Sequence, residues 1–265
     1  GPTQMSPNSP AGRRPRPSRV LIATESSCDA DFAIEAGIGL AVATGSSLEG
    51  IFIEDANLVR LARLPFVVET STLTGAKRRF ATDEIERALR VEAARIEGLI
   101  ARSAANARVA WTFQVLQGPL IAAVGAQRAE LALIAGNASR LGPAATTRSA
   151  LRPIAALFDT SIAGWRGIEA ASRLARSLGR ALLMLIPATG PIEPEQLAQE
   201  AAAWQHREGV AGSVVPIHGD TASMITALRT HRIALLTVPA PELGTLAFDL
   251  AQLLIESSCP VMIAR

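Results

Sequence analysis

The stretch Val20-Leu21-Ile22-Ala23-Thr24-Glu25-Ser26-Ser27 decides the fold, because a second version of it follows 134 residues later as Ile154-Ala155-Ala156-Leu157-Phe158-Asp159-Thr160-Ser161. In each version a short apolar run ends in an acidic side chain and two hydroxyl side chains. Such apolar runs are typical of fully buried strands, and the polar residues directly after them are typical of helix N-caps. The sequence therefore predicts two copies of one strand–helix unit.

The repeat continues well beyond this stretch. The same offset places Ile34-Glu35-Ala36 on Ile168-Glu169-Ala170 and Gly45 on Gly179 without a gap. Further along, the offset falls to 101, which places Gly118 on Gly219, so the second copy is shorter by 33 residues between its second and third strands. We expect a disordered tail over residues 1–18, a first domain over 19–150 and a second, shorter domain over 151–265.

Strands and helices are expected to alternate in both copies. The first copy predicts strands at Val20–Thr24, Leu48–Ile53, Val109–Leu116 and Leu131–Ala135, and a long helix over about Asp83–Ala104. The second predicts strands near Ile154–Phe158, Ala181–Ile186, Val210–Ile217 and Ala234–Val238, then a helix over Thr245–Ser257 and a last strand at Val261–Ala264. This order predicts an α/β fold of two tandem doubly wound, Rossmann-like parallel-sheet lobes, whose ligands bind at the carboxyl ends of the strands.

Composition excludes several classes of protein. The net charge of +2 comes largely from Arg13, Arg14, Arg16 and Arg19, so the rest of the chain offers no basic face for nucleic acid. No apolar run approaches the length of a membrane span, and the amino-terminal region has no secretory signal, so we expect a cytoplasmic protein without a membrane partner. Gly1 to Gln4, before Met5, are typical of residues left by an expression vector. Cys28 and Cys259 lie too far apart for a metal motif and are expected to be structural thiols.

Several segments, in this order, resemble the universal stress protein family. They are Val20-Leu21-Ile22-Ala23-Thr24, Ala43-Thr44-Gly45, Leu48-Glu49-Gly50-Ile51-Phe52-Ile53-Glu54-Asp55, Leu61-Ala62-Arg63-Leu64-Pro65-Phe66 and Cys259-Pro260-Val261-Met262-Ile263-Ala264-Arg265. The likeness covers residues 19–265 and implies a tandem, two-domain member. Members that bind ATP are similar to one another in an acid after the first strand and in a loop of three spaced glycines after the fourth, where backbone amides approach the phosphates.

Neither copy keeps that glycine spacing. The first copy has Gly136-Asn137-Ala138-Ser139-Arg140-Leu141-Gly142 in this position, with Glu25 as the acid. The second keeps Asp159, but its loop Pro239-Ala240-Pro241-Glu242-Leu243-Gly244 lacks two amide donors and carries an acid that repels phosphate. The resemblance therefore leaves two possibilities: the first lobe binds ATP or AMP, or the chain binds no nucleotide. The candidate ligand residues are Ala23, Thr24, Glu25, Ser26, Phe52, Ile53, Gly136, Asn137, Arg140 and Gly142.

Two further departures concern partners. Family members often dimerise through their fifth strands, and only the second copy retains one, so we expect Val261–Ala264 to pair with the same strand of a second chain. The segment Asp55–Ala81, absent from the second copy, mixes apolar residues with Lys77-Arg78-Arg79. It is either a cap over the ligand edge of the sheet or a docking surface.

An enzyme is not expected. His206, His218 and His231 show no metal spacing, and the chain has no nucleophile elbow, Walker loop or paired cysteine motif. Two hypotheses from different classes remain. The first is a non-catalytic regulatory protein of a bacterial stress response that acts through protein contacts, and the second is an adenine-nucleotide sensor that uses the first lobe.

Overall fold

The computed structural model describes residues 19–25, 28–54, 68–70, 77–79, 82–127, 129–137, 152–188, 193–244 and 247–265. Of residues 28, 29, 68–70, 77–79, 82 and 137 only the backbone is described. The predicted tail therefore lies outside the described residues.

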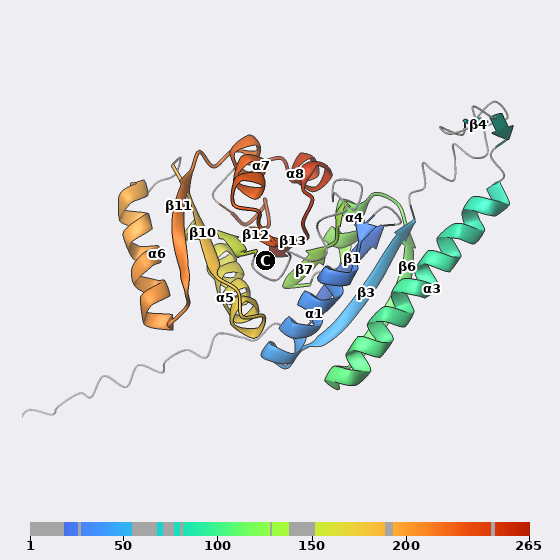
Figure 1. The fold of residues 1–265 in the computed structure, drawn as a ribbon, viewed down its shortest axis with the longest axis horizontal. Coiled ribbons are helices and arrows are strands. Elements are labelled where there is room, and N and C mark those ends of the chain that lie inside the picture. The colour runs from blue at the N-terminus through green and yellow to red at the C-terminus, as the bar shows by residue number, and fades with distance from the viewer. Residues whose placement is uncertain are drawn as a thin grey trace, which may run out of the picture.

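The two copies share one nine-stranded sheet (Figure 1). The first copy contributes β1 (Arg19–Glu25), β3 (Ser47–Glu54), β6 (Trp111–Gln117) and β7 (Leu131–Ile134). The second contributes β9 (Ile154–Leu157), β10 (Leu182–Pro187), β11 (Gly212–Ile217), β12 (Leu235–Pro239) and β13 (Val261–Ala264). The strand order is β11-β10-β9-β12-β13-β7-β1-β3-β6, and every pair is parallel except β13 with β7. The predicted doubly wound α/β class is confirmed, with the two lobes joined edge to edge.

Strand register reproduces both offsets of the sequence repeat. Leu48 of β3 lies opposite Trp111 of β6, and Leu182 of β10 lies opposite Gly212 of β11. Adding 134 to the first residue and 101 to the second converts one pair into the other. The third strands of the two copies, β6 and β11, are therefore equivalent residue by residue, and they form the two edges of the sheet.

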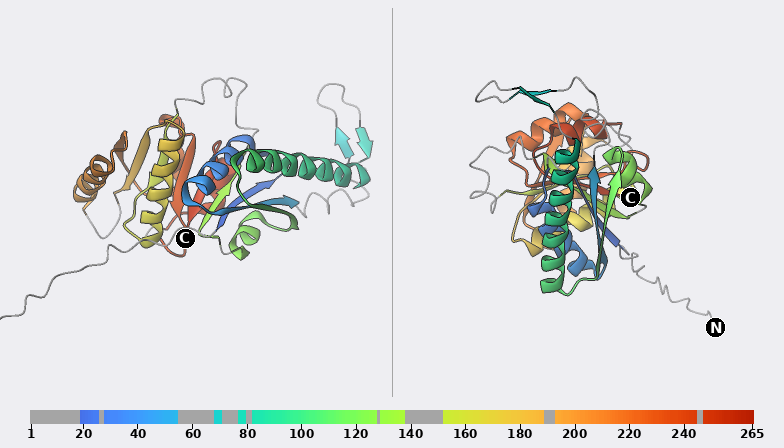
Figure 2. Two further views of the ribbon diagram at one scale, coloured as in Figure 1. Left: turned by 90° about the horizontal axis from the view of Figure 1, so that it is seen from below. Right: turned by 90° about the vertical axis from the view of Figure 1, so that its right-hand side faces the viewer.

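Helices cover both faces of the sheet (Figures 1 and 2). One face packs against α1 (Asp31–Thr44), α3 (Thr82–Ala107), α5 (Ile162–Ser177) and α6 (Pro194–Glu208), and the other against α4 (Leu120–Ala126), α7 (Thr221–Thr230) and α8 (Leu250–Glu256). The inner strands are buried on both faces and are mostly apolar, whereas the edge strands β6 and β11 are only partly buried. Two short antiparallel pairs lie outside the sheet: β2 (Cys28–Asp29) with β8 (Gly136–Asn137), and β4 (Val68–Thr70) with β5 (Lys77–Arg79). None of the described helices has the length and apolarity needed to cross a membrane.

Helix ends follow the sequence in part. Gly45 ends α1 in the left-handed conformation, with φ of 67°, which glycine adopts without strain. Ala30 is the N-cap of α1 and has no side chain that could cap it, and Ser26 and Ser27 lie outside the described residues. The last helix begins later than predicted, because the side chain of Asp249 accepts from the amide of Gln252 and starts α8 there.

Strand β13 is not an edge strand, and the prediction that Val261–Ala264 pairs with a second chain is wrong. It lies between β12, to which it is parallel, and β7, to which it is antiparallel, so both sides of its backbone are used within the chain. The first copy has no fifth strand of its own in the described residues, and β13 occupies the place beside β7. One strand thus completes both lobes.

A second contact between the copies lies where α1 packs against α5. A Cβ on Gly39 of α1 would lie 3.6 Å from the side chain of Leu174 in α5, and the guanidinium of Arg180 stacks 4.6 Å from the ring centroid of Phe32. Burial lowers the pKa of Arg180, which the nearby carboxylate of Glu35 partly offsets. The lobes are therefore joined through the sheet and through one layer of helices.

A buried charge in β13 tests whether the lobes depend on each other. Met262 is fully buried opposite Leu133 of β7, so we expect Met262→Asp to cost more than about 4 kcal/mol and to unfold both lobes together, because a carboxylate there has no described partner. Met262→Leu conserves volume and should cost less than about 1.5 kcal/mol. Urea unfolding followed by circular dichroism and by tryptophan fluorescence measures both. A Met262→Asp protein in which one lobe still unfolds cooperatively would contradict the shared-strand account.

Candidate functional site

The topology brings most of the predicted ligand positions of the first lobe to one edge. Glu25, the last residue of β1, lies opposite Ile53 of β3, and the amide of Ala135 donates to the carbonyl of Ala23 at 3.0 Å. The carboxyl ends of β1, β3 and β7 therefore converge as expected, because parallel strands end on the same side of the sheet.

Three of the predicted ligand residues have buried side chains. Ala23, Phe52 and Ile53 are at most 1% exposed and belong to the two apolar cores on either face of the sheet. Thr24 is also buried, and its hydroxyl has no hydrogen-bond partner among the described residues. Glu25 is half-buried at the end of the strand. Of the predicted ligand residues, Thr24 and Glu25 are the ones whose described side chains carry polar atoms at this end of the sheet.

Gly136, the first glycine of the predicted phosphate loop, is packed against the second copy. A Cβ at this position would lie 2.6 Å from the carbonyl carbon of Cys259 and 2.8 Å from its oxygen. Gly136 and Asn137 also form β8, which pairs with β2 directly after the first strand. The glycine is thus required for the close approach of one backbone to another, and the space that phosphate would need beside it is filled by Cys259.

The remaining predicted residues are only partly placed. The backbone of Asn137 lies opposite Cys28 in the same short ladder. Ser26, Arg140 and Gly142 lie outside the described residues, as does most of Asp55–Ala81. The strands of that segment that are described, β4 and β5, lie near the amino-terminal end of α3 (Figure 1).

The described part of the first-lobe site is closely packed. The backbone of Gly136 and Asn137 pairs with β2, Gly136 lies against Cys259, and the side chains of Ala23, Phe52 and Ile53 are in the core. The hydroxyl of Thr24, which has no hydrogen-bond partner among the described residues, favours a ligand, but it is too deeply buried to reach one without movement of the chain.

In the second lobe the acid after the first strand is held by its own turn. Asp159 is 2% exposed, and its Oδ1 accepts from the amide of Ser161 at 3.1 Å and from the Ser161 hydroxyl at 2.6 Å. The Ser161 hydroxyl in turn accepts from the amide of Gly164 at 2.9 Å and caps α5. Thr160, between the two, has φ of 64°, an uncommon conformation for a residue with a side chain.

Two glycines close this turn around the carboxylate. A Cβ on Gly164 would lie 2.3 Å from Oδ1 of Asp159, and a Cβ on Gly244 would lie 3.0 Å from Oδ2. The carboxylate lies at the amino-terminal end of α5, where the helix dipole favours negative charge. Asp159 therefore orders the turn between β9 and α5, and Gly164 and Gly244 make room for its carboxylate.

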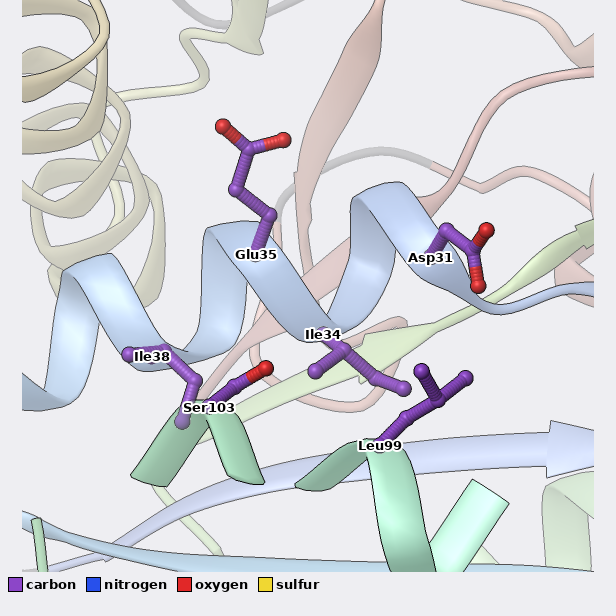
Figure 3. A pocket seen from close by; sticks show the side chains of 6 residues that line it. All are labelled: Asp31, Ile34, Glu35, Ile38, Leu99 and Ser103. Atoms are coloured by element: carbon purple, nitrogen blue, oxygen red, sulfur yellow. The ribbon is translucent and has the colours of Figure 1, made fainter. Parts of the chain in front are cut away.

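A pocket that sequence reasoning missed lies between α1 and α3, with a volume of about 300 Å³. In Figure 3, Ile34 and Ile38 of α1 point toward Leu99 and Ser103 of α3, whereas the carboxylate of Glu35 points away from α3 and Asp31 lies about one turn earlier on α1. Asp31 and Glu35, and likewise Ile34 and Ile38, are four residues apart, which is the only signal in the sequence. Its other wall comes from a helix that begins about fifty residues later, so only the fold forms the pocket.

The thiol of Cys259 is buried. Burial raises the pKa of the Cys259 thiol to about 12, so the thiol is protonated at neutral pH and is a poor nucleophile. No group of three or more His, Cys, Asp or Glu side chains with metal-binding geometry occurs among the described residues.

No family model matches the sequence, and no curated protein matches it significantly. Solved structures do match. The chain is similar to a universal stress protein from Archaeoglobus fulgidus DSM 4304, with 10% identity, coverage of 92% of this chain and 96% of that chain, and a TM-score of 0.50.

Two others are a protein from the universal stress protein family of Burkholderia pseudomallei (21% identity, 43% and 96% covered, TM-score 0.34) and a putative universal stress protein from Pseudomonas aeruginosa UCBPP-PA14 (12% identity, 94% and 93% covered, TM-score 0.44). The Archaeoglobus structure matches nearly the whole of this chain, both copies included. The chain therefore has the fold of the universal stress proteins.

Proposed function

We propose that this chain is a non-catalytic member of the universal stress protein family that regulates a bacterial stress response through protein contacts, without a bound nucleotide. The observation that carries the proposal is the contact of Gly136 with the backbone of Cys259. Gly136 is the one glycine of the first-lobe loop that the structure describes, and through this contact it lies at the junction between the copies. A regulatory protein in which this contact closes the carboxyl ends of the first-lobe strands would bind partner proteins through its outer helices and through the edge strands of its sheet.

The second lobe supports the same conclusion. Its acid is enclosed by Ser161, Gly164 and Gly244, and the carbonyl of Ala240 accepts from the amides of Leu243 and Gly244 within the following loop. Amides that bind a carbonyl of their own turn are not available to phosphate. In both lobes, described residues at the carboxyl ends of the strands thus make close contacts within the chain.

The alternative is an adenine-nucleotide sensor that uses the first lobe. The buried, unpartnered hydroxyl of Thr24 favours it, because such a group normally has a partner. The sensor requires β8 to leave β2 and the loop to move away from Cys259 before a phosphate can enter. That cost makes protein contacts the better proposal.

Nucleotide binding distinguishes the two. We expect no AMP or ATP in the supernatant of the denatured protein, no release of phosphate from ATP, and no thermal shift with millimolar ATP, whereas a ligand at a hundred times its Kd would stabilise the fold by about 2.7 kcal/mol. If a saturable shift is found, Thr24→Val identifies its site, because it keeps the shape of the side chain and removes only the hydroxyl. A shift that Thr24→Val abolishes would replace the proposal with the sensor.

The role of Gly136 has its own test. We expect Gly136→Ala to destabilise the protein by about 1–3 kcal/mol or more, because the added methyl group meets backbone atoms of Cys259 that cannot rotate away. Gly125→Ala in α4 is the matched control, since a Cβ there meets nothing within 4 Å and a helix interior prefers alanine by about 0.5–1 kcal/mol.

Urea unfolding of both variants measures the difference. Gly136→Ala as stable as the wild type would mean that the loop is not packed against Cys259 and that the ligand edge is open. Replacement of Gly136 by a larger residue is not a test of nucleotide binding, because the same clash would remove binding and folding together.

A further inference from the structure

The two ends of the sheet are topologically equivalent but chemically different. Strand β6 ends the first copy and β11 ends the second, and each has a neighbour on one side only among the described residues. Strand β6 consists of Trp-Thr-Phe-Gln-Val-Leu-Gln, with neither a proline nor a charged residue. Natural edge strands usually carry one or the other, which prevents pairing with another chain.

The hydrogen bonds to β3 show which backbone groups of β6 point outward. Leu48 donates its amide to the carbonyl of Ala110, and Gly118 donates its amide to the carbonyl of Glu54, so the even-numbered residues between them face β3. The N–H and C=O groups of the odd-numbered residues therefore point away from the sheet. Within the described part of the chain no backbone hydrogen bond engages them; these residues are Trp111, Phe113, Val115 and Gln117.

Strand β11 has a block at one of these outward positions. Leu182 donates its amide to the carbonyl of Ala211, and Ala188 donates its amide to the carbonyl of Ile217, so Pro216 faces outward. Pro216 lies opposite Ile186, and Val115 lies opposite Phe52, which makes them the same position of the repeat. Proline removes an outward donor and places its ring on the open side. One edge of the duplicated sheet is thus protected and the other is not.

We propose that β6 pairs antiparallel with β6 of a second copy of this chain, about a two-fold axis through Gln114. This register joins the outward residues to one another: Phe113 faces Val115 of the second copy, and Trp111 faces Gln117. Opposite residues of an antiparallel pair lie on one face, so Val115, 46% exposed in the single chain, packs against the aromatic ring of the facing Phe113. The same strand supplies both halves, as an isologous interface requires.

Among the described residues, no strand lies on the outward side of β6. Helix α3 packs on one face of the sheet beside β6 and α4 covers the other, and β6 lies between them in the view from that side (Figure 2, right). A two-fold axis perpendicular to the sheet places the two copies of α3 on the same face. Helices α1 and α5 already share a face across the junction of β7 and β13 in this way. The proposal does not depend on whether a nucleotide binds.

Sedimentation equilibrium from low micromolar to several hundred micromolar tests the proposal. We expect a species of twice the 27.8 kDa of one chain, and we expect Val115→Pro to raise the dissociation constant at least roughly tenfold, because it removes an outward donor from each strand. Pro216→Val is the matched control at the equivalent position and should leave the β6 dimer intact.

Val115→Lys serves as a second variant should the proline disturb folding, since it keeps the amide and places a charge opposite the facing Phe113. Hydrogen exchange identifies the surface. The amides of Phe113 and Val115 should exchange slowly in concentrated samples and fast on dilution, whereas those of Gln114 and Leu116, which face β3, should be protected throughout. A monomer at all concentrations, or a dimer that is insensitive to both variants, would overturn the proposal.

Discussion

The antiparallel pairing of β13 with β7 is the interaction on which the rest of the structure depends. It supplies the first copy with the fifth strand that it lacks, and it turns two small sheets into one. A four-stranded first lobe would otherwise expose the backbone of β7, whose residues are buried on both faces. The requirement to cover that edge explains why β13, the last strand of the chain, lies in the middle of the sheet.

The same pairing also brings the chain before β13 close to the carboxyl ends of the first-lobe strands. The chain that leads into β13 passes Gly136 so closely that only hydrogen fits between them, and the short ladder of β2 with β8 forms beside it. In the second lobe the carboxylate of Asp159 is satisfied by Ser161 and surrounded by glycines. Gly136, Gly164 and Gly244 therefore have close structural partners within the chain.

The two copies also differ in their third strands, β6 and β11, which form the edges of the sheet. Their third strands align residue by residue, yet Val115 in one corresponds to Pro216 in the other. Both strands make the same contacts to their inner neighbours, because those contacts use the backbone of the intervening residues. At this position the difference in the backbone lies on the outward side, where no described strand pairs with β6 or β11.

The sequence by itself determined the repeat, the order of strands and helices, and the convergence of Glu25, Ile53 and Gly136 at one end of the sheet. Short apolar runs that alternate with helices and recur at a fixed offset predict parallel strands within each copy. Tertiary structure alone decided that β13 is central, that Gly136 meets Cys259, and that Ile34 and Leu99 border one pocket. These contacts join residues far apart in the chain, and local pattern carries no information about which distant backbone or side chain fills a given space.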